Sequence, residues 1–387
     1  MKINTLHILS ALLSAVGMLL SACTEDTSFV QSDEDEAGRV ILSYSVTGNT
    51  LSRASEPGWN DGWNENEVDR LDLFIFRNGT FIKHYGEDLQ VTANQNNNEE
   101  TNYHDWKIPD SELSPNEVQQ GDLVYLIANC PTVTLNGASK SLNEIKSLAD
   151  LQAASIGTLS CHEKQKTFVM TGTATVEEKS GNDVVIKVDL YRAAAKIRIS
   201  FSNESESNWS DGITYRFVQY TQSSALLQES DETYLSTVQL STYPSKNVEE
   251  ESVDINTTEN YYAPNKQLVL YSYVNNWYQQ KGEDELYGEI PIDENKQTYI
   301  ILYAPYGNDG KKYYYKVPIN YQLPEDNDAI TPDESYKDLY RLQRNYLYDI
   351  TVTIDRKGGS EKEPVVTDFT IVVEQWDEKD IDVPAFE

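Results

Sequence analysis

Basic residues are scarce in this sequence. It contains 31 lysines and arginines against 63 aspartates and glutamates, which gives a formal net charge of −32. Binding to nucleic acid or to an anionic membrane surface requires clusters of lysine and arginine that neutralise phosphate groups. The charge balance therefore argues against both partners and favours solubility and mutual repulsion between molecules.

Cysteine and histidine are scarce as well. The three cysteines, Cys23, Cys130 and Cys161, are too few for a disulfide framework, and the sequence leaves open whether Cys130 and Cys161 pair. The four histidines are not at the spacing of metal ligands. No glycine-rich phosphate loop or nucleophile elbow is present. The many carboxylates leave a glycosidase pair open, but none is singled out, so we expect no enzyme, no cofactor and no metal.

Long apolar runs are missing except for one, which follows Met1-Lys2 and ends at Leu20. A basic start, an apolar stretch and small residues at its end are typical of a secretory signal, and the run is too short to span a membrane. Leu20-Ser21-Ala22-Cys23 resembles the lipobox of bacterial lipoproteins. The resemblance implies that residues 1–22 are removed and that Cys23 carries the acyl chains, including palmitate, that anchor the protein in the outer membrane. The alternative is an ordinary signal with an incidental cysteine.

The sequence is rich in the residue pattern of β-strands. It has 26 tyrosines, and apolar residues alternate with polar ones in several segments. The clearest segment is 346–354, where every even position is apolar or aromatic. Similar alternation predicts strands at 40–46, 184–188 and 195–201, and denser apolar runs predict central strands, covered on both faces, at 71–76, 123–128 and 298–303.

One segment has the pattern of a helix. Ser141-Leu142-Asn143-Glu144 has the residues of a capping box, and Leu142, Ile145, Leu148 and Leu151 follow at three-residue spacing. We predict one helix here that covers the edge of a sandwich.

Several stretches occur in a characteristic order, among them VDRLDLFIF, LVYLIANCP, LYRAAAKIRISF, QRNYLYDITVTI and FTIVVEQWDEKDIDV. The most specific features are Arg344-Asn345 before an alternating strand, RAAAKI in mid-chain and Trp376 at the end of the last strand. Together they resemble the major fimbrial subunit (fimbrillin, FimA-type) lipoprotein family of Bacteroidales along nearly the whole chain.

The resemblance implies a mainly β protein with two transthyretin-like antiparallel β-sandwich domains and one or two short helices. The implied organisation is a signal peptide (1–22), a lipidated propeptide with the first strand (23–53), an N-terminal sandwich (54–190) and a C-terminal sandwich with a donor-strand tail (191–387). A domain boundary near residue 190 also agrees with the new strand that is predicted to begin at Tyr191.

Members of that family reach the surface as lipoproteins, are cut after an arginine by an arginine-specific protease, and polymerise by donor-strand exchange. Two arginines precede the first domain here. Cleavage after Arg39 would leave the first strand attached, whereas cleavage between Arg53 and Ala54 removes it, and Arg53 lies in a polar, glycine-containing linker. We therefore expect a detachable edge strand carrying Val40, Leu42, Tyr44 and Val46.

The replacing donor strand would come from the C-terminus of a neighbour. Its alternating apolar residues are Ile381, Val383 and Ala385, which continue the direction of Ile371 and Val373. Pro384 lacks a backbone donor and residues 377–380 interrupt the apolar pattern. A C-terminal strand that stays folded in its own domain is therefore the alternative.

The predicted function is a structural subunit of a surface fimbria involved in cell adhesion, at a shaft, tip or accessory position that the sequence leaves open. Its partners would be other copies or related subunits, the processing protease, the outer membrane before processing, and surface ligands of a host or another bacterium. The alternatives are a membrane anchor subunit of the fimbria and a surface glycan-binding lipoprotein.

Overall fold

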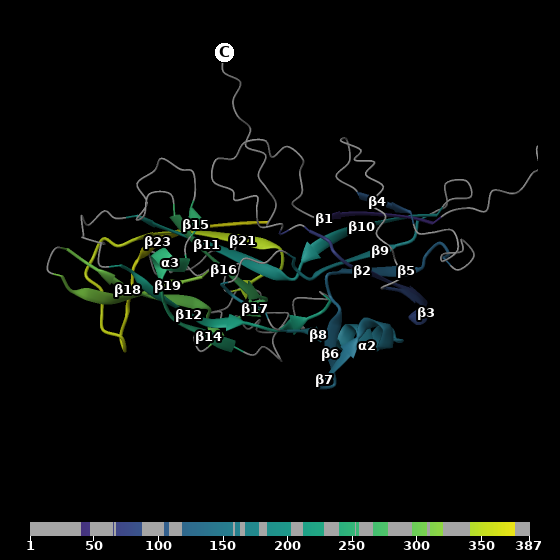
Figure 1. Ribbon diagram of the computed structural model, residues 1–387, viewed down its shortest axis with the longest axis horizontal. Helices are drawn as coiled ribbons and strands as arrows, with labels where there is room; N and C mark the ends of the chain where they lie inside the picture. Colours follow the sequence, from purple (N-terminus) through teal and green to yellow (C-terminus); the bar gives the residue numbers. More distant parts are fainter. Residues whose placement is uncertain are drawn as a thin grey trace, which may run out of the picture. The chain divides into compact units, whose positions relative to one another are not determined.

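The computed structural model describes residues 40–46, 65, 67–86, 104–107, 118–157, 159–162, 167–177, 184–202, 212–227, 240–251, 253–254, 266–277, 296–307, 310–319 and 341–375. Strands dominate this part of the chain (Figure 1). The mainly β class expected from the alternating segments is therefore confirmed.

Seven strands of the N-terminal half form one hydrogen-bonded sheet in the order β3-β2-β5-β9-β10-β1-β4. Their bounds are β1 Val40–Val46, β2 Leu71–Arg77, β3 Thr80–Tyr85, β4 His104–Lys107, β5 Leu123–Ala128, β9 Met170–Thr175 and β10 Val184–Arg192. The apolar run of β2 is buried from Leu71 to Phe76, which confirms that both of its faces are covered. The other predicted strands in this half also form, at β1, β5 and β10.

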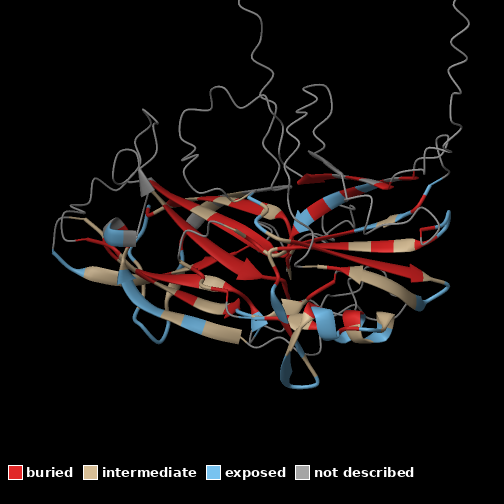
Figure 2. Ribbon diagram, turned by 45° about the vertical axis from the view of Figure 1, so that its right-hand side comes forward, coloured by how far each residue is buried: buried red, intermediate tan, exposed pale blue. Residues whose placement is uncertain are grey.

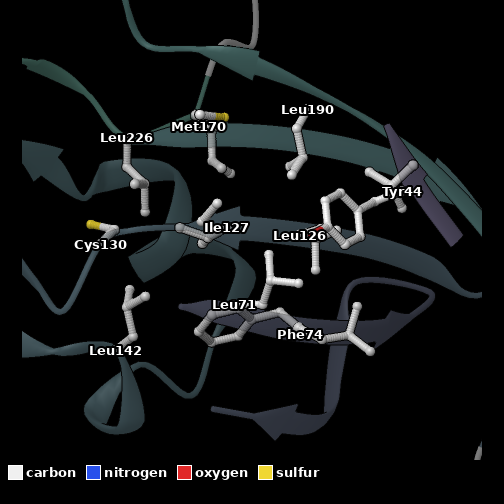
Figure 3. Packing of buried hydrophobic residues seen from close by; sticks show 14 of the residues in the cluster. Tyr44, Leu71, Phe74, Leu126, Ile127, Cys130, Leu142, Met170, Leu190 and Leu226 are labelled. Atoms are coloured by element: carbon white, nitrogen blue, oxygen red, sulfur yellow. The ribbon is translucent and has the colours of Figure 1, made fainter. Parts of the chain in front are cut away.

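This sheet turns back on itself at the crossing of β9 and β10. The two strands pair only through Tyr191 and Arg192 of β10, after which β10 pairs with β1 instead. The crossing is tight at Gly172, because a Cβ atom there would lie 2.1 Å from the carbonyl oxygen of Asp189. The buried faces of the two parts then meet, and Figure 3 shows Leu190 and Tyr44 pointing toward Leu126.

A small sheet of order β13-β8-β6-β7 accompanies the predicted helical segment. Its strands are β6 Thr132–Leu135, β7 Ala138–Ser141, β8 Ser155–Ile156 and β13 Ser224–Ala225. The predicted capping box at Ser141 is confirmed. The prediction of a single helix is wrong, because a 3-10 turn, η2 Leu142–Glu144, is followed by a separate helix, α2 Leu148–Ala153. The side chain of Ser147 caps α2 by accepting from the backbone N–H of Asp150 at 3.0 Å, and a new cap of this kind interrupts helical geometry.

The C-terminal half contains two five-stranded sheets, ordered β15-β16-β11-β21-β23 and β14-β12-β18-β19-β22, and the pair β17-β20. The bounds are β11 Ala194–Ser202, β12 Thr214–Thr221, β14 Leu240–Asn247, α3 Val248–Glu251, β15 Val253–Asp254, β16 Lys266–Tyr273, β17 Asn275–Asn276, β18 Tyr299–Pro305, β19 Lys312–Pro318, β20 Arg341–Leu342, β21 Tyr346–Thr353, β22 Val365–Val366 and β23 Asp368–Gln375. In β21 the residues Tyr348, Ile350 and Val352 are buried and the odd positions between them are half-buried, as the alternation predicts.

The buried apolar residues form two clusters, and Figure 2 shows the buried positions in red along the strands. Most residues of the first cluster lie between Val40 and Ala194, and most residues of the second lie at or after Ala195. The exceptions are Cys161, which belongs to the second cluster, and Leu226, Leu227, Val269, Tyr271 and Tyr273, which belong to the first. Cys130 belongs to the first cluster and Cys161 to the second, and no disulfide joins them. Burial raises the pKa of the Cys130 thiol to about 12, so this side chain stays protonated at neutral pH.

Candidate functional site

The candidate site is the place that β1 occupies in the N-terminal sheet, which we call the β1 site. β1 pairs in parallel with β10, from Val40 opposite Val184 to Val46 opposite Leu190. On its other side β1 pairs with β4 in the antiparallel sense, over Ile41 to Tyr44. The β1 site is therefore bounded by β10 and β4.

The side chains of β1 that alternate toward the core are all buried. Val40 is 3% exposed, Leu42 0%, Tyr44 6% and Val46 2%, and all four belong to the first cluster. Burying each side chain of this kind stabilises a fold by about 1.5–3 kcal/mol, so the four together contribute on the order of 6–12 kcal/mol before the entropy of ordering the strand is subtracted. A strand that leaves this site exposes a continuous apolar surface.

The neighbouring strand β10 depends on β1 for its hydrogen bonds. Among the described strands, only β1 pairs with the stretch from Val184 to Leu190, because β9 contacts β10 further on, at Tyr191 and Arg192. The inward side chains of this stretch, Val184, Ile186, Val188 and Leu190, are at most 1% exposed. Loss of β1 would therefore leave β10 with an open backbone edge and an uncovered apolar row, which is a template for strand addition.

The expectation of an edge strand is wrong in one respect. β4 lies outside β1, so β1 is the second strand from the end of the sheet. The pairing with β4 is short, since β4 pairs with only four of the seven residues of β1. Departure of β1 therefore requires the breaking of hydrogen bonds on both sides, with the longer row on the β10 side.

The outer face of the β1 site carries charge. Ser43 lies opposite Lys187 and Ser45 lies opposite Asp189. The hydroxyl of Ser45 donates to Oδ1 of Asp189 at 2.6 Å. Both charged residues are exposed, on the face of β10 opposite to its buried side chains.

A second polar centre joins the two sequence signatures RAAAKI and Arg344-Asn345. Nη1 of Arg192 donates to Oδ1 of Asn345 at 2.8 Å, and the backbone N–H of Asn345 donates to the carbonyl of Ala194 at 2.9 Å. Asn345 has a φ of 59°, a left-handed conformation that asparagine tolerates better than most residues. Arg344 donates to the carbonyls of Ala225 and Leu226.

Glu65, which follows the predicted processing region in the sequence, is held at this polar centre. Oε2 accepts from Nζ of Lys196 at 2.6 Å, and Oε1 accepts from the hydroxyl of Tyr271 at 2.6 Å. Nε of Arg192 donates to the Glu65 carbonyl at 3.3 Å. Burial lowers the pKa of Lys196, while the Glu65 carboxylate opposes that shift, and burial raises the pKa of Tyr271 well above its ordinary value. These contacts fix the chain between β1 and β2 at Glu65.

The described residues contain no group of three or more His, Cys, Asp or Glu placed to hold a metal ion. Within the same part of the chain, no helix is both long enough and apolar enough to pass through a bilayer.

Comparison with known families decides what kind of protein carries this site. The family described as "Fimbrillin-A associated anchor proteins Mfa1 and Mfa2" matches residues 31–382. The chain belongs to this family. The resemblance to Bacteroidales fimbrial subunits is therefore confirmed.

A curated relative of this Mfa-family protein is the major fimbrium tip subunit FimD of Porphyromonas gingivalis (strain ATCC 33277). It is 24% identical over 377 residues, which cover 93% of this chain and 47% of FimD. The chain thus spans about half the length of the curated relatives that it matches.

Similar solved structures include two from P. gingivalis. The tip fimbrial protein Mfa3 with C-terminal truncation has 13% identity and a TM-score of 0.48, covering 87% of this chain and 98% of that one. A fimbrilin (fimA) of strain W83 has 13% identity and a TM-score of 0.47, covering 87% of this chain and 96% of that one.

The predicted site residues of the Mfa-family protein fall into two groups. Val40, Leu42, Tyr44 and Val46 are described and lie together on the inner face of β1. The others lie outside the described residues: Cys23, Arg53, Ala54, Ile381, Val383 and Ala385.

Ile371 and Val373, whose direction the predicted donor residues continue, belong to β23, which pairs with β21 from Asp368 to Gln375. Ile371 packs against the second cluster. The predicted donor residues Ile381, Val383 and Ala385 come after Gln375 in the sequence.

Sequence reasoning missed Glu65 and β4. Glu65 stands in a polar stretch that contains other acidic residues and asparagines, so its own sequence context does not distinguish it. β4 is only four residues long, HDWK, and lacks the alternation that marks the other strands. Both owe their roles to partners that are distant in the sequence.

Proposed function

We propose that this fimbrial subunit travels to the cell surface as a lipoprotein acylated at Cys23, is cut between Arg53 and Ala54, and joins its neighbour by exchanging β1 for that neighbour's C-terminal strand. In this proposal the protein acts as a structural and adhesive component of a surface fimbrium and not as an enzyme. Its partners are other fimbrial subunits and an arginine-specific protease.

One observation carries the proposal. β1 supplies four buried side chains to the first cluster and is the described pairing partner of β10 over seven residues. A single cut after β1 therefore turns a covalently attached part of the sheet into a separate strand. Its replacement by a strand of the same period restores both the hydrogen bonds and the buried surface, as in donor-strand complementation generally.

The bounds of β1 favour Arg53 over Arg39 as the processing site. β1 begins at Val40, directly after Arg39. A cut after Arg39 would remove the lipid but leave β1 attached to the subunit. A cut after Arg53 removes the lipid and β1 together, which couples release from the membrane to activation of the β1 site.

The same reasoning bears on the position of the subunit in the fimbria. An anchor subunit would keep its lipid and its first strand, whereas a polymerising or tip subunit would lose both. The Arg53 linker therefore favours a polymerising or tip position, and the similarity to the tip subunit FimD points the same way.

Cleavage and assembly can be tested together. The purified mature protein is treated with an arginine-specific protease under native conditions and analysed by electrophoresis without boiling. We expect a product that begins at Ala54 and forms ladders, also when Arg39→Ala is introduced as the matched control, and no ladders from Arg53→Ala. Ladders from Arg53→Ala would overturn the processing role, and an unchanged monomer retarded on polysaccharide gels would support a glycan-binding lipoprotein instead.

A further inference from the structure

A lysine and a glutamate meet in the interior of the protein. Nζ of Lys196 lies 2.6 Å from Oε2 of Glu65, and the two side chains are 3% and 11% exposed. On the surface of the same chain, Nζ of Lys140 lies 2.8 Å from Oε1 of Glu144, and these side chains are 41% and 50% exposed. The two pairs have the same functional groups at nearly the same distance, so their main difference is the access of water.

Neighbouring strands hold the buried pair together. Lys196 of β11 lies opposite Tyr271 of β16 and opposite Leu347 of β21, so the three side chains are on the same face of the sheet. Tyr271 is 0% exposed and Leu347 is 4% exposed. Nε of Arg192 donates to the backbone carbonyl of Glu65 at 3.3 Å. The amine and the carboxyl group are therefore in contact at a place from which most water is excluded.

The surroundings of Lys196 favour an uncharged amine. Burial lowers the pKa of Lys196, and the Glu65 carboxylate opposes that shift. The nearby guanidinium groups of Arg192 and Arg198 lower the pKa further. Transfer of the proton from Nζ to the carboxylate removes two buried charges, which are costly in a medium of low dielectric constant. The product of this transfer is a lysine amine, which is a nucleophile, beside a carboxylic acid.

The hydroxyl of Tyr271 is placed to stabilise an oxyanion. It donates to Oε1 of Glu65 at 2.6 Å, whereas Lys196 contacts Oε2. Burial raises the pKa of the phenol well above its ordinary value, so Tyr271 keeps its proton at neutral pH. A donor at Oε1 draws electrons away from Cδ and stabilises the negative charge that Oε1 gains when an amine attacks Cδ.

We propose that Lys196 and Glu65 condense spontaneously to an intramolecular isopeptide bond. One proton passes from Nζ to Oε2, the lone pair of Nζ attacks Cδ, and the carbonyl electron pair moves onto Oε1, which accepts a hydrogen bond from Tyr271. A second proton then passes from Nζ to Oε2. The bond between Cδ and Oε2 breaks, one water molecule leaves, and the double bond between Cδ and Oε1 forms again. No oxidant, reductant or cofactor is consumed.

Proximity makes this reaction feasible. In bulk water an ammonium group and a carboxylate do not condense, because both are ionised and solvated. Groups held in contact by a protein react as if their concentration were on the order of 10⁵–10⁸ M. The uncharged pair is the minor form, so the bond forms slowly. Newly folded protein therefore contains the ion pair, and the cross-linked form accumulates with time.

The bond closes a covalent loop from residue 65 to residue 196. This loop contains every described strand of the N-terminal sheet except β1. A covalently closed loop stabilises a fold because it restricts the unfolded chain. β1 precedes Glu65 in the sequence, so a cut after Arg53 leaves the bond in place. The cross-link is therefore independent of strand exchange.

The first test uses the unmodified protein. It is kept under native conditions for several days, and samples are analysed by intact-protein mass spectrometry and, after tryptic digestion, by peptide sequencing. We expect a species lighter by one water molecule to increase with time, and a branched peptide in which Glu65 is joined to Lys196. The peptides that contain Lys140 and Glu144 should keep their full mass. A constant protein mass, or a loss of water located elsewhere in the chain, would overturn the proposal.

The second test assigns the roles of the two side chains around Glu65. Lys196→Arg keeps the positive charge, but a guanidinium group stays protonated and is not a nucleophile, so this variant should lose no water. Tyr271→Phe keeps the ring and removes the donor, and should slow the loss of water on the order of 100-fold. Circular dichroism confirms that both variants are folded. Loss of water from Lys196→Arg would overturn the role of the lysine, and an unchanged rate in Tyr271→Phe would overturn the role of the phenol.

Discussion

Arg192 and Asn345 are 153 residues apart in the sequence, and Nη1 of Arg192 donates to Oδ1 of Asn345 at 2.8 Å. Arg192 is 1% exposed and Asn345 is 3% exposed, so the guanidinium group is satisfied by partners within the protein. Arg192 ends β10, which forms one wall of the β1 site, and Asn345 immediately precedes β21. The contact therefore connects β10 with the sheet β15-β16-β11-β21-β23 of the C-terminal half.

Asn345→Ala should lower the free energy of unfolding by about 2–4 kcal/mol. The substitution leaves a buried guanidinium without one acceptor and places alanine in a left-handed conformation. Asn136→Ala is the matched control, because Asn136 has a φ of 53° but is exposed in the β6–β7 turn. Urea unfolding of both variants separates the backbone contribution from the side-chain contact, and equal losses would show that the Arg192 contact contributes nothing.

Glu65→Gln should destabilise the protein by about 3–5 kcal/mol, because it removes the carboxylate that pairs with Lys196, whose side chain is 3% exposed. The loss should be smaller at about pH 9.5 than at neutral pH. Burial depresses the pKa of Lys196 below its ordinary value of 10.5. Below this depressed pKa the lysine is charged in the folded variant, and the unpaired charge destabilises the fold in full. As the pH rises above it the lysine loses its proton and the destabilisation becomes smaller. Chemical unfolding at the two pH values measures this difference.

Glu144→Gln is the control for this substitution. Glu144 pairs with Lys140 at 2.8 Å on the surface, where both side chains are at least 41% exposed, so its removal should change stability little at either pH. A pH-independent loss in Glu65→Gln would mean that the charge of Lys196 is not what the carboxylate stabilises.

The alternating strands of this protein were predictable because their signal is local. Tyr348, Ile350 and Val352 repeat with the period of a strand, and that period alone specifies which side chains face the core. The helical segment shows the limit of such reasoning: Leu142, Ile145, Leu148 and Leu151 have suitable spacing and three of them are buried, yet the cap at Ser147 divides the segment.

The candidate site was predictable only in part, because only some of its features have a local signal in the sequence. The inner face of β1 follows from its alternation, whereas the parallel pairing with β10 and the cover by β4 depend on contacts between distant segments. Arg192 and Asn345 stand out in the sequence, but their direct contact follows from the tertiary structure alone. Glu65 has no local signal, because its partners Lys196 and Tyr271 come from other strands.

The protein should lose stability in alkali above about pH 10, the ordinary pKa of tyrosine. Burial raises the pKa of Tyr315 to about 12, and also raises the pKa values of Tyr271 and Tyr273. The folded state then holds protons that the unfolded state has released, so the free energy of unfolding falls as pH rises through this range. Tyr315→Phe should make the fall shallower, as measured by urea unfolding at several pH values; an unchanged slope would contradict this cause.

Gly172→Ala should destabilise the N-terminal sheet by roughly 3 kcal/mol or more, because its Cβ would overlap the carbonyl oxygen of Asp189. Gly157→Ala is the matched control, since a Cβ there has nothing within 4 Å. Thermal unfolding of the two variants measures the difference. Equal stability of both would show that β9 and β10 can separate at this crossing without penalty.

Leu42→Ala should speed the release of β1 once the chain has been cut after Arg53. Leu42 is 0% exposed, and truncation of a buried leucine removes about 2–5 kcal/mol of stability. In the uncut protein the loss appears as reduced resistance to urea, whereas in the cut protein it falls on the contact that retains the fragment. Leu268→Ala in β16 is the control, because Leu268 is equally buried but belongs to the second cluster. It should lower the stability of the uncut protein to a similar extent without accelerating fragment release, as followed by size-exclusion chromatography after cleavage. If both variants release the fragment at the parental rate, the apolar face of β1 does not control strand departure, and the hydrogen bonds to β10 and β4 must set the rate instead.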